Sequence, residues 1–181
     1  MMYVKKIIFL LILAIFIVPL TSAFANSNKP SVAIMPFSDQ SPRKGVITQN
    51  EINDIRLDIE TDIVQTGRFR PLTRTEIDKL LAEMQFDNSG LVDPATAAEY
   101  GKMIGANYLV LGTITGVSES KGKNFTINVS LRMIEVETAE IFLAGRGTGK
   151  SKKNAFEALQ KATEDALRGQ RGMLTMLRGR A

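Results

Sequence analysis

The sequence contains no cysteine and no histidine among its 181 residues. Without cysteine the protein forms no disulfide, so packing alone must hold its core even in an oxidising compartment. The same absence excludes a lipid anchor attached to a cysteine. Without histidine the protein lacks the commonest general base and transition-metal ligand. We therefore expect neither a metal site nor a cofactor.

Long apolar runs are also scarce, and the one present lies at the N-terminus. Two lysines precede the run Ile7–Leu20, and Ala23-Phe24-Ala25 follows it with the small-x-small pattern that signal peptidase reads. The run has about 14 residues, fewer than the ~20 that span a bilayer as a helix. The sequence predicts an exported protein with a signal peptide over residues 1–25, cleaved between Ala25 and Asn26. The alternative is an uncleaved membrane anchor.

The charge balance is nearly even. Cleavage of the signal peptide removes two lysines and no acid, which lowers the net charge from +4 to +2. So small a charge does not favour nucleic acid or an anionic membrane surface as a partner.

Hydrophobic periodicity predicts a single α/β (α+β) domain over residues 31–168, between a linker (26–30) and a basic C-terminal tail (169–181). Strands are expected at 31–37, 69–72, 107–117, 125–136 and 141–148. Helices are expected to begin at the capping boxes Thr48–Glu51 and Thr73–Glu76, at Asp93-Pro94 and at Ser151. Helical crossovers early in the chain imply parallel pairing, and short late turns imply antiparallel pairing. This order predicts a mixed sheet of about five strands with helices packed on it.

The tail has two interpretations of equal weight. Arg168 just before it and Arg171, Arg178 and Arg180 within it surround apolar residues, which is typical of an amphipathic helix for a partner or for the outer-membrane surface. Three glycines weaken such a helix, so a frayed tail that docks a few apolar side chains fits equally well.

A relaxed phosphate-loop pattern occupies Ala144–Ser151, with a strand before it and a helix after it. In a nucleotide-binding enzyme, Lys150 would contact the terminal phosphates. The pattern comes after most of the sheet, however, and no apolar strand ends in an aspartate that could hold magnesium. We favour an edge strand whose small residues lead into the cap of the final helix.

Other catalytic patterns are weaker still. Ser118-Glu119-Ser120-Lys121 matches the serine-x-x-lysine signature of penicillin-recognising enzymes, but the companion motifs are missing. We expect this tetrad at a solvated hairpin tip. The acidic residues fall mainly on expected helix surfaces or caps, so no carboxylate pair stands out. We expect no catalytic residue.

Several segments together resemble a known family. They are Val32–Phe37, Thr66–Phe69, Ser89–Asp93, Ala97–Ala106 with its two glycines, Tyr108–Gly112 and the turn Glu137–Ile141. Their order is similar to that of the CsgG-type family, named for the secretion channel of curli fibres. The resemblance implies a non-enzymatic protein of the bacterial envelope, located in the periplasm. It implies envelope proteins as partners, either a secretion component or a penicillin-binding protein that the protein activates.

The sequence departs from the channel members of that family in two ways. Those members are lipoproteins, and this chain has no cysteine to acylate. They also carry hairpins that cross the outer membrane, whereas the connection 118–124 is short. We therefore expect the domain without the pore, as a monomer or weak homo-oligomer. If subunits associate, the strand 141–148, Arg56 and Asp58 of the first helix, or the tail would supply the contact.

Overall fold

The computed structural model describes residues 29–83, 93–120, 122 and 124–176, the last eight by backbone alone. The predicted signal peptide, its cleavage site and most of Ser89–Asp93 lie outside these residues. The strands are β1 (Ser31–Ile34), β2 (Ser38–Asp39), β3 (Arg70–Pro71), β4 (Tyr108–Ser120), β5 (Asn124–Glu135) and β6 (Glu140–Ser151). The helices are α2 (Gln49–Gln65), α3 (Arg74–Glu83), α4 (Pro94–Met103) and α5 (Ala155–Met176).

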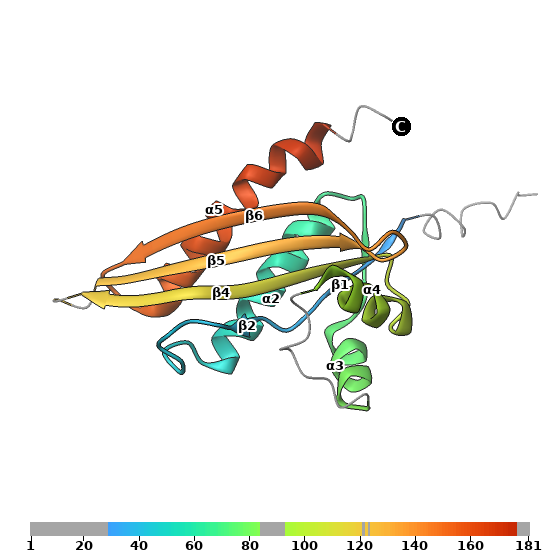
Figure 1. Ribbon diagram of the computed structural model, residues 1–181. Helices are drawn as coiled ribbons and strands as arrows, with labels where there is room; N and C mark the ends of the chain where they lie inside the picture. Colours follow the sequence, from blue (N-terminus) through green and yellow to red (C-terminus); the bar gives the residue numbers. More distant parts are fainter. Residues whose placement is uncertain (1–28, 84–92, 121, 123, 177–181) are drawn as a thin grey trace, which may run out of the picture.

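The strands form one mixed sheet in the order β3-β1-β4-β5-β6, with β2 also paired to β4 (Figure 1). The pairs β1–β3, β1–β4 and β2–β4 are parallel, whereas β4–β5 and β5–β6 are antiparallel. Both the α/β class and this division between early and late strands confirm the prediction.

The first predicted strand, 31–37, is divided in two. After β1, the Met35 amide still donates to the Val110 carbonyl at 3.0 Å, but Pro36 has no amide proton to continue the ladder. The chain then rejoins β4 as β2, where Ser38 pairs with Thr113. The proline therefore accounts for the interruption.

Local capping determines where α2 and α4 begin. The Thr48 amide donates to Glu51 Oε2 at 2.7 Å, and the Glu51 amide donates to the Thr48 hydroxyl at 3.3 Å, which completes the predicted capping box. At α4, the Asp93 carboxylate accepts from the Thr96 amide at 3.0 Å. That bond, together with the Thr96 hydroxyl, holds the pKa of Asp93 below its usual value.

The last helix begins differently from the prediction. Ser151 is the last residue of β6 and does not cap α5. The Glu157 amide instead donates to Asn154 Oδ1 at 2.8 Å, so an asparagine three residues later is the cap.

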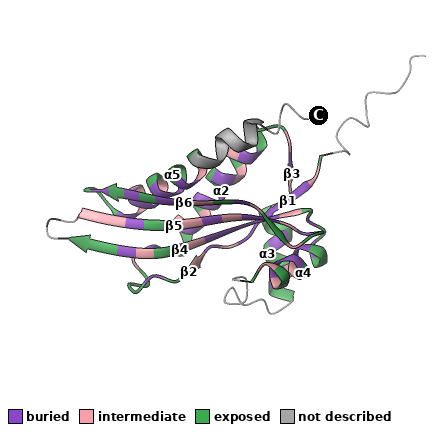
Figure 2. Ribbon diagram, turned by 45° about the horizontal axis from the view of Figure 1, so that its top comes forward, coloured by how far each residue is buried: buried purple, intermediate pink, exposed green. Residues whose placement is uncertain are grey.

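Helices cover the two faces of the sheet unequally. On one face α2 and α5 bury a long apolar layer that includes Ile59, Val129 and Leu159. On the other face α3 and α4 bury a smaller cluster around Met35 and Leu109, near β1. The far half of β4–β6 therefore has a helical layer on one side only (Figures 1 and 2). Within the described part of the chain, no helix combines the length and apolarity needed to cross a bilayer.

Candidate functional site

The phosphate-loop pattern is not a loop. All of Ala144–Ser151 belongs to β6, in antiparallel register with β5 from Arg132 to Phe125. The backbone amides that would have to surround a phosphate are part of a strand. The nucleotide-binding interpretation of this segment is therefore wrong. β6 is an edge strand, as the favoured interpretation predicted.

The glycines of this segment serve packing instead. A Cβ atom on Gly149 would overlap the backbone of α5 at Ala158, and one on Gly147 would overlap it at Ala162. Both alanines are fully buried. Alternate glycines thus let helix and strand approach at backbone distance, with small residues on both sides.

The opposite face of the same strands is polar, and no described helix or strand covers it. Asn128 lies at its centre: its side-chain oxygen accepts from the Thr148 hydroxyl at 2.9 Å, and its carbonyl accepts from the Thr115 hydroxyl at 3.3 Å. These three residues are exposed. We call this region the open sheet face: Thr113, Thr115, Ser118, Thr126, Asn128, Ser130, Arg146 and Thr148. Its hydroxyl and amide groups suit hydrogen bonding to another molecule.

The free edge of β6 is partly covered by α5. The Thr148 amide donates to Asp165 Oδ2 at 3.1 Å, and Lys161 Nζ donates to the Lys150 carbonyl at 3.3 Å. Side chains of α5 therefore satisfy outward-facing backbone groups that a neighbouring strand would otherwise pair with.

A basic hollow lies beside this edge. It has a volume of about 660 Å³, and Lys150, Lys152, Lys153 and Lys161 line it together with Phe125 and Glu157. Glu157 accepts from Lys161 at 2.9 Å and from the Ser151 hydroxyl at 2.8 Å. These two donors hold the pKa of Glu157 below its usual value. We call this region the lysine hollow.

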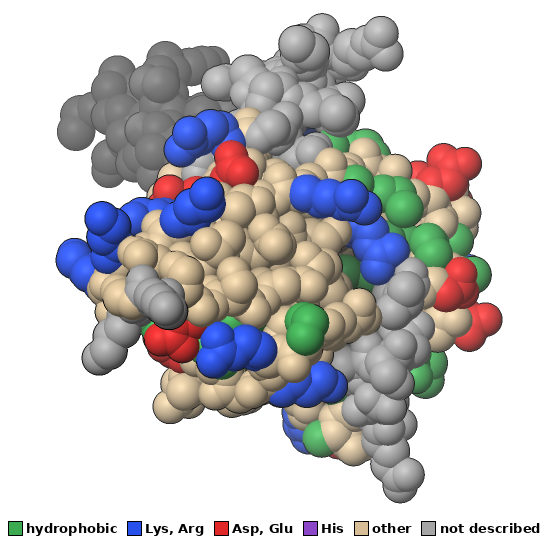
Figure 3. All heavy atoms as spheres, turned by 60° about the vertical axis from the view of Figure 1, so that its left-hand side comes forward, with side chains coloured by type: hydrophobic (Ala, Val, Ile, Leu, Met, Phe, Trp, Pro, Cys, Tyr) green, Lys and Arg blue, Asp and Glu red, His purple; other side chains and the backbone are tan. Residues whose placement is uncertain are grey.

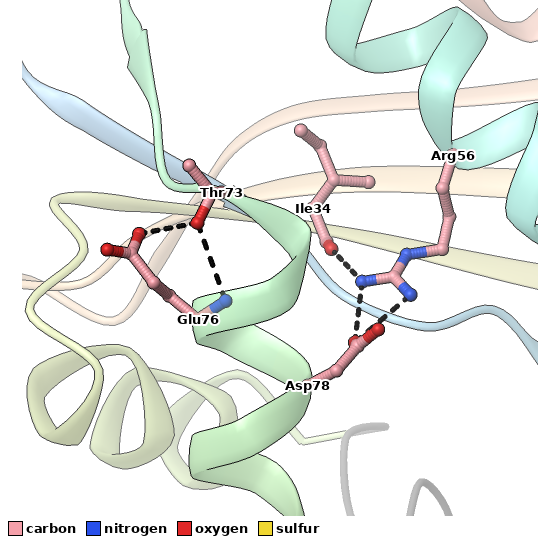
Figure 4. A network of polar contacts seen from close by, with 5 residues as sticks. All are labelled: Ile34, Arg56, Thr73, Glu76 and Asp78. Atoms are coloured by element: carbon pink, nitrogen blue, oxygen red, sulfur yellow. Dashed lines mark hydrogen bonds and ion pairs between the residues drawn. The ribbon is translucent and has the colours of Figure 1, made fainter.

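Arg56 and Asp58 of α2 were predicted as possible contacts between subunits. For Arg56 this prediction is wrong. Its side chain is 3% exposed, and its guanidinium donates to Asp78 of α3 and to the Ile34 carbonyl (Figure 4). Arg56 is therefore buried within the subunit and is not available to contact a neighbouring one. Asp58 is exposed and lines a groove between α2 and α5, together with Asp62 and Glu164.

The serine-x-x-lysine tetrad is also placed differently from the prediction. Ser118 to Ser120 end β4 and are not in a turn, although all three are exposed; Lys121 lies outside the described residues. No group of three Asp or Glu side chains suited to hold a metal ion occurs in the described ranges.

Comparison with known families decides the relationship. The model for the family described as curli production assembly/transport component CsgG matches residues 17–161. The chain belongs to the CsgG family. Membership supports an envelope-associated role in binding or assembly. No curated protein sequence matches the chain.

Solved structures of the same fold come from several bacteria. Lipoprotein GNA1162 from Neisseria meningitidis is 12% identical, covers 83% of this chain and 94% of its own, and has a TM-score of 0.53. The PelC dodecamer from Paraburkholderia phytofirmans is 10% identical over 77% of this chain and 86% of its own, with a TM-score of 0.51. LpoB from Escherichia coli is 12% identical over 68% of this chain and 59% of its own, with a TM-score of 0.50. At these identities the likeness shows the fold alone.

The segments that resemble the CsgG family are largely packing elements. A Cβ on Gly101 would overlap Val136, and one on Gly112 would overlap the Phe37 ring. The lysine hollow was not evident from the sequence. The hollow needs Lys161, which α5 brings beside Lys150 only after the helix packs on β6.

Proposed function

We propose that the protein is a periplasmic binding and assembly module that presents the open sheet face to another envelope protein. Its membership of the CsgG family supports the envelope role. We choose this surface because helices cover the two faces of the sheet unequally. Beyond α3 and α4, the strands display aligned hydroxyl and amide groups that no element of the described chain covers. Polar groups of this kind give specificity in a wet interface.

Site-specific photo-crosslinking in intact cells tests this surface. A photoreactive residue at Ser118 of β4 or Arg146 of β6, both exposed on the open sheet face, is expected to capture one discrete envelope protein. The matched controls are Lys79 of α3 and Glu99 of α4, which are equally exposed on the covered side. We expect Thr115→Arg, at the centre of the face, to reduce the crosslink at least tenfold. Equal capture from all four positions, or none from the face, would contradict the proposal.

The alternative function is activation of a penicillin-binding protein, which the family resemblance also implies. Secretion and activation would use the same domain and differ in the partner. The identity of the captured protein therefore separates them: a secretion component favours export, and a penicillin-binding protein favours cell-wall synthesis.

The export proposal predicts a specific mature N-terminus. Intact-mass measurement of the protein from the periplasmic fraction is expected to show a chain that begins at Asn26. Ala25→Arg places a large charged residue where signal peptidase needs a small one, so the full-length precursor should accumulate. An unprocessed wild-type chain held in the membrane would favour the anchor alternative.

We also propose that the mature protein is a monomer or a weak oligomer. Its β6 edge is partly covered by α5, and Arg56 is buried, so two of the three predicted contacts are reduced or lost. Light scattering at micromolar concentration is expected to give the monomer mass. A stable ring of eight or more subunits would contradict this and restore the pore interpretation.

A further inference from the structure

The lysine hollow concentrates positive charge well beyond what its neighbours balance. Lys150 ends the exposed side of β6, Lys152 and Lys153 follow in the connection to α5, and Lys161 comes from the second turn of that helix. Among the described residues that line the hollow, Glu157 is the one acidic residue. Figure 3, viewed from the strand tips, shows Lys and Arg side chains spread around uncharged surface at this end of the molecule. The small net charge of the whole chain does not predict that four lysines line one hollow.

Most of these ammonium groups are not used by the fold. Among the described residues, Lys161 is the one member of the four that forms an ion pair. Lys153 acts on Glu157 only through its charge at longer range. Because like charges held close together repel, an anion that enters the hollow would relieve the repulsion as well as gain hydrogen bonds.

The other residues that line the hollow indicate which kind of anion would fit. Ser120, Asn124 and Thr126 add polar groups, and half-buried Phe125 supplies an apolar wall. Asn154 already accepts from the Glu157 amide at the start of α5, and the lysine ammonium groups supply the formal positive charge of the hollow. Lysine is a compact point charge with three rotatable donors, which suits phosphate oxygens approached from several directions.

We propose that the lysine hollow binds a phosphate group carried on a larger molecule. The phosphate would sit among Lys150, Lys152 and Lys153, while Lys161 stays paired with Glu157. This site adjoins the open sheet face, with which it shares Thr126, but its binding does not depend on the proposed partner.

The test compares two phosphate sources with the purified mature protein. One arm titrates inorganic pyrophosphate by calorimetry, and the other sediments the protein with phosphatidylglycerol vesicles against phosphatidylcholine vesicles. The variant is Lys150→Gln/Lys152→Gln/Lys153→Gln. The matched control is Lys44→Gln/Lys79→Gln/Lys102→Gln, which removes the same net charge from exposed positions elsewhere.

We expect the hollow variant to bind at least tenfold more weakly than wild type, and the control variant to bind within twofold of it. Added sodium chloride should weaken wild-type binding, because the lysines are exposed to solvent. Pyrophosphate binding indicates a soluble phosphorylated ligand, whereas binding to anionic vesicles alone indicates a lipid headgroup. The proposal is overturned if wild type binds neither source at millimolar phosphate. It is also overturned if both variants lose binding equally, or if phosphate-free oligoglutamate binds as well as pyrophosphate.

Discussion

Replacing Gly149 by valine is expected to lower the free energy of unfolding by more than about 3 kcal/mol. A Cβ there meets the Ala158 carbonyl and the Ala162 amide, which are helix backbone and cannot rotate away. The helix would have to lift from β6 and open the layer that buries Leu159. Since a domain is stable by only about 5–15 kcal/mol, this loss is a large part of the total. Urea denaturation monitored by circular dichroism measures it.

The sign of this effect distinguishes packing from local preference. Valine favours strands and glycine weakens them, so strand propensity alone predicts that Gly149→Val stabilises the protein. The control is Arg146→Val in the same strand, on the exposed side, which we expect to change stability by less than about 0.5 kcal/mol. If the two variants were equally stable, α5 would not be seated on these glycines.

The elements that the sequence predicted well are those with local signals. The capping box at Thr48 and Glu51 forms within four residues, so no tertiary information is needed to find it. The alternation along β5 likewise reports one buried and one open face directly. Such features are properties of a short segment.

The elements that were missed depend on packing partners from distant segments. The sequence predicts β6 as a strand but does not show why glycines alternate in it, because the reason is the passage of α5 across them. Arg56 looks like a surface residue of a helix, and its burial depends on α3. The lysine hollow likewise joins β6 to α5. The sequence therefore predicts the fold better than the surfaces.

Substitutions in the Arg56–Asp78 ion pair are expected to have the second large effect on stability. The two partners differ in how far they are buried, and this difference makes the test informative. Arg56 is 3% exposed and Asp78 is 47% exposed by side chain, so exposure alone suggests that Asp78 matters less. One Asp78 oxygen, Oδ1, accepts from both terminal guanidinium nitrogens, at 3.2 and 3.1 Å. Arg56 Nη2 also donates to the Ile34 carbonyl at 2.9 Å, and Arg56 Nε has no hydrogen-bond partner among the described residues. Figure 4 shows this pair joining α2, β1 and α3.

We expect Asp78→Ala to lower the free energy of unfolding by about 3 kcal/mol, because it leaves a buried cation with a single carbonyl for compensation. Arg56→Met keeps most of the buried volume and removes the charge, and the Asp78 carboxylate it leaves behind is half exposed to water. That variant should therefore cost clearly less than Asp78→Ala. In a double-mutant cycle, adding Asp78→Ala to Arg56→Met should change stability by less than about 0.5 kcal/mol, since the charge that needed compensation is gone. Urea denaturation of the three variants tests this order. If the two single substitutions were additive, the carboxylate would not be compensating the buried guanidinium, and α3 would be held to the sheet by its apolar contacts alone.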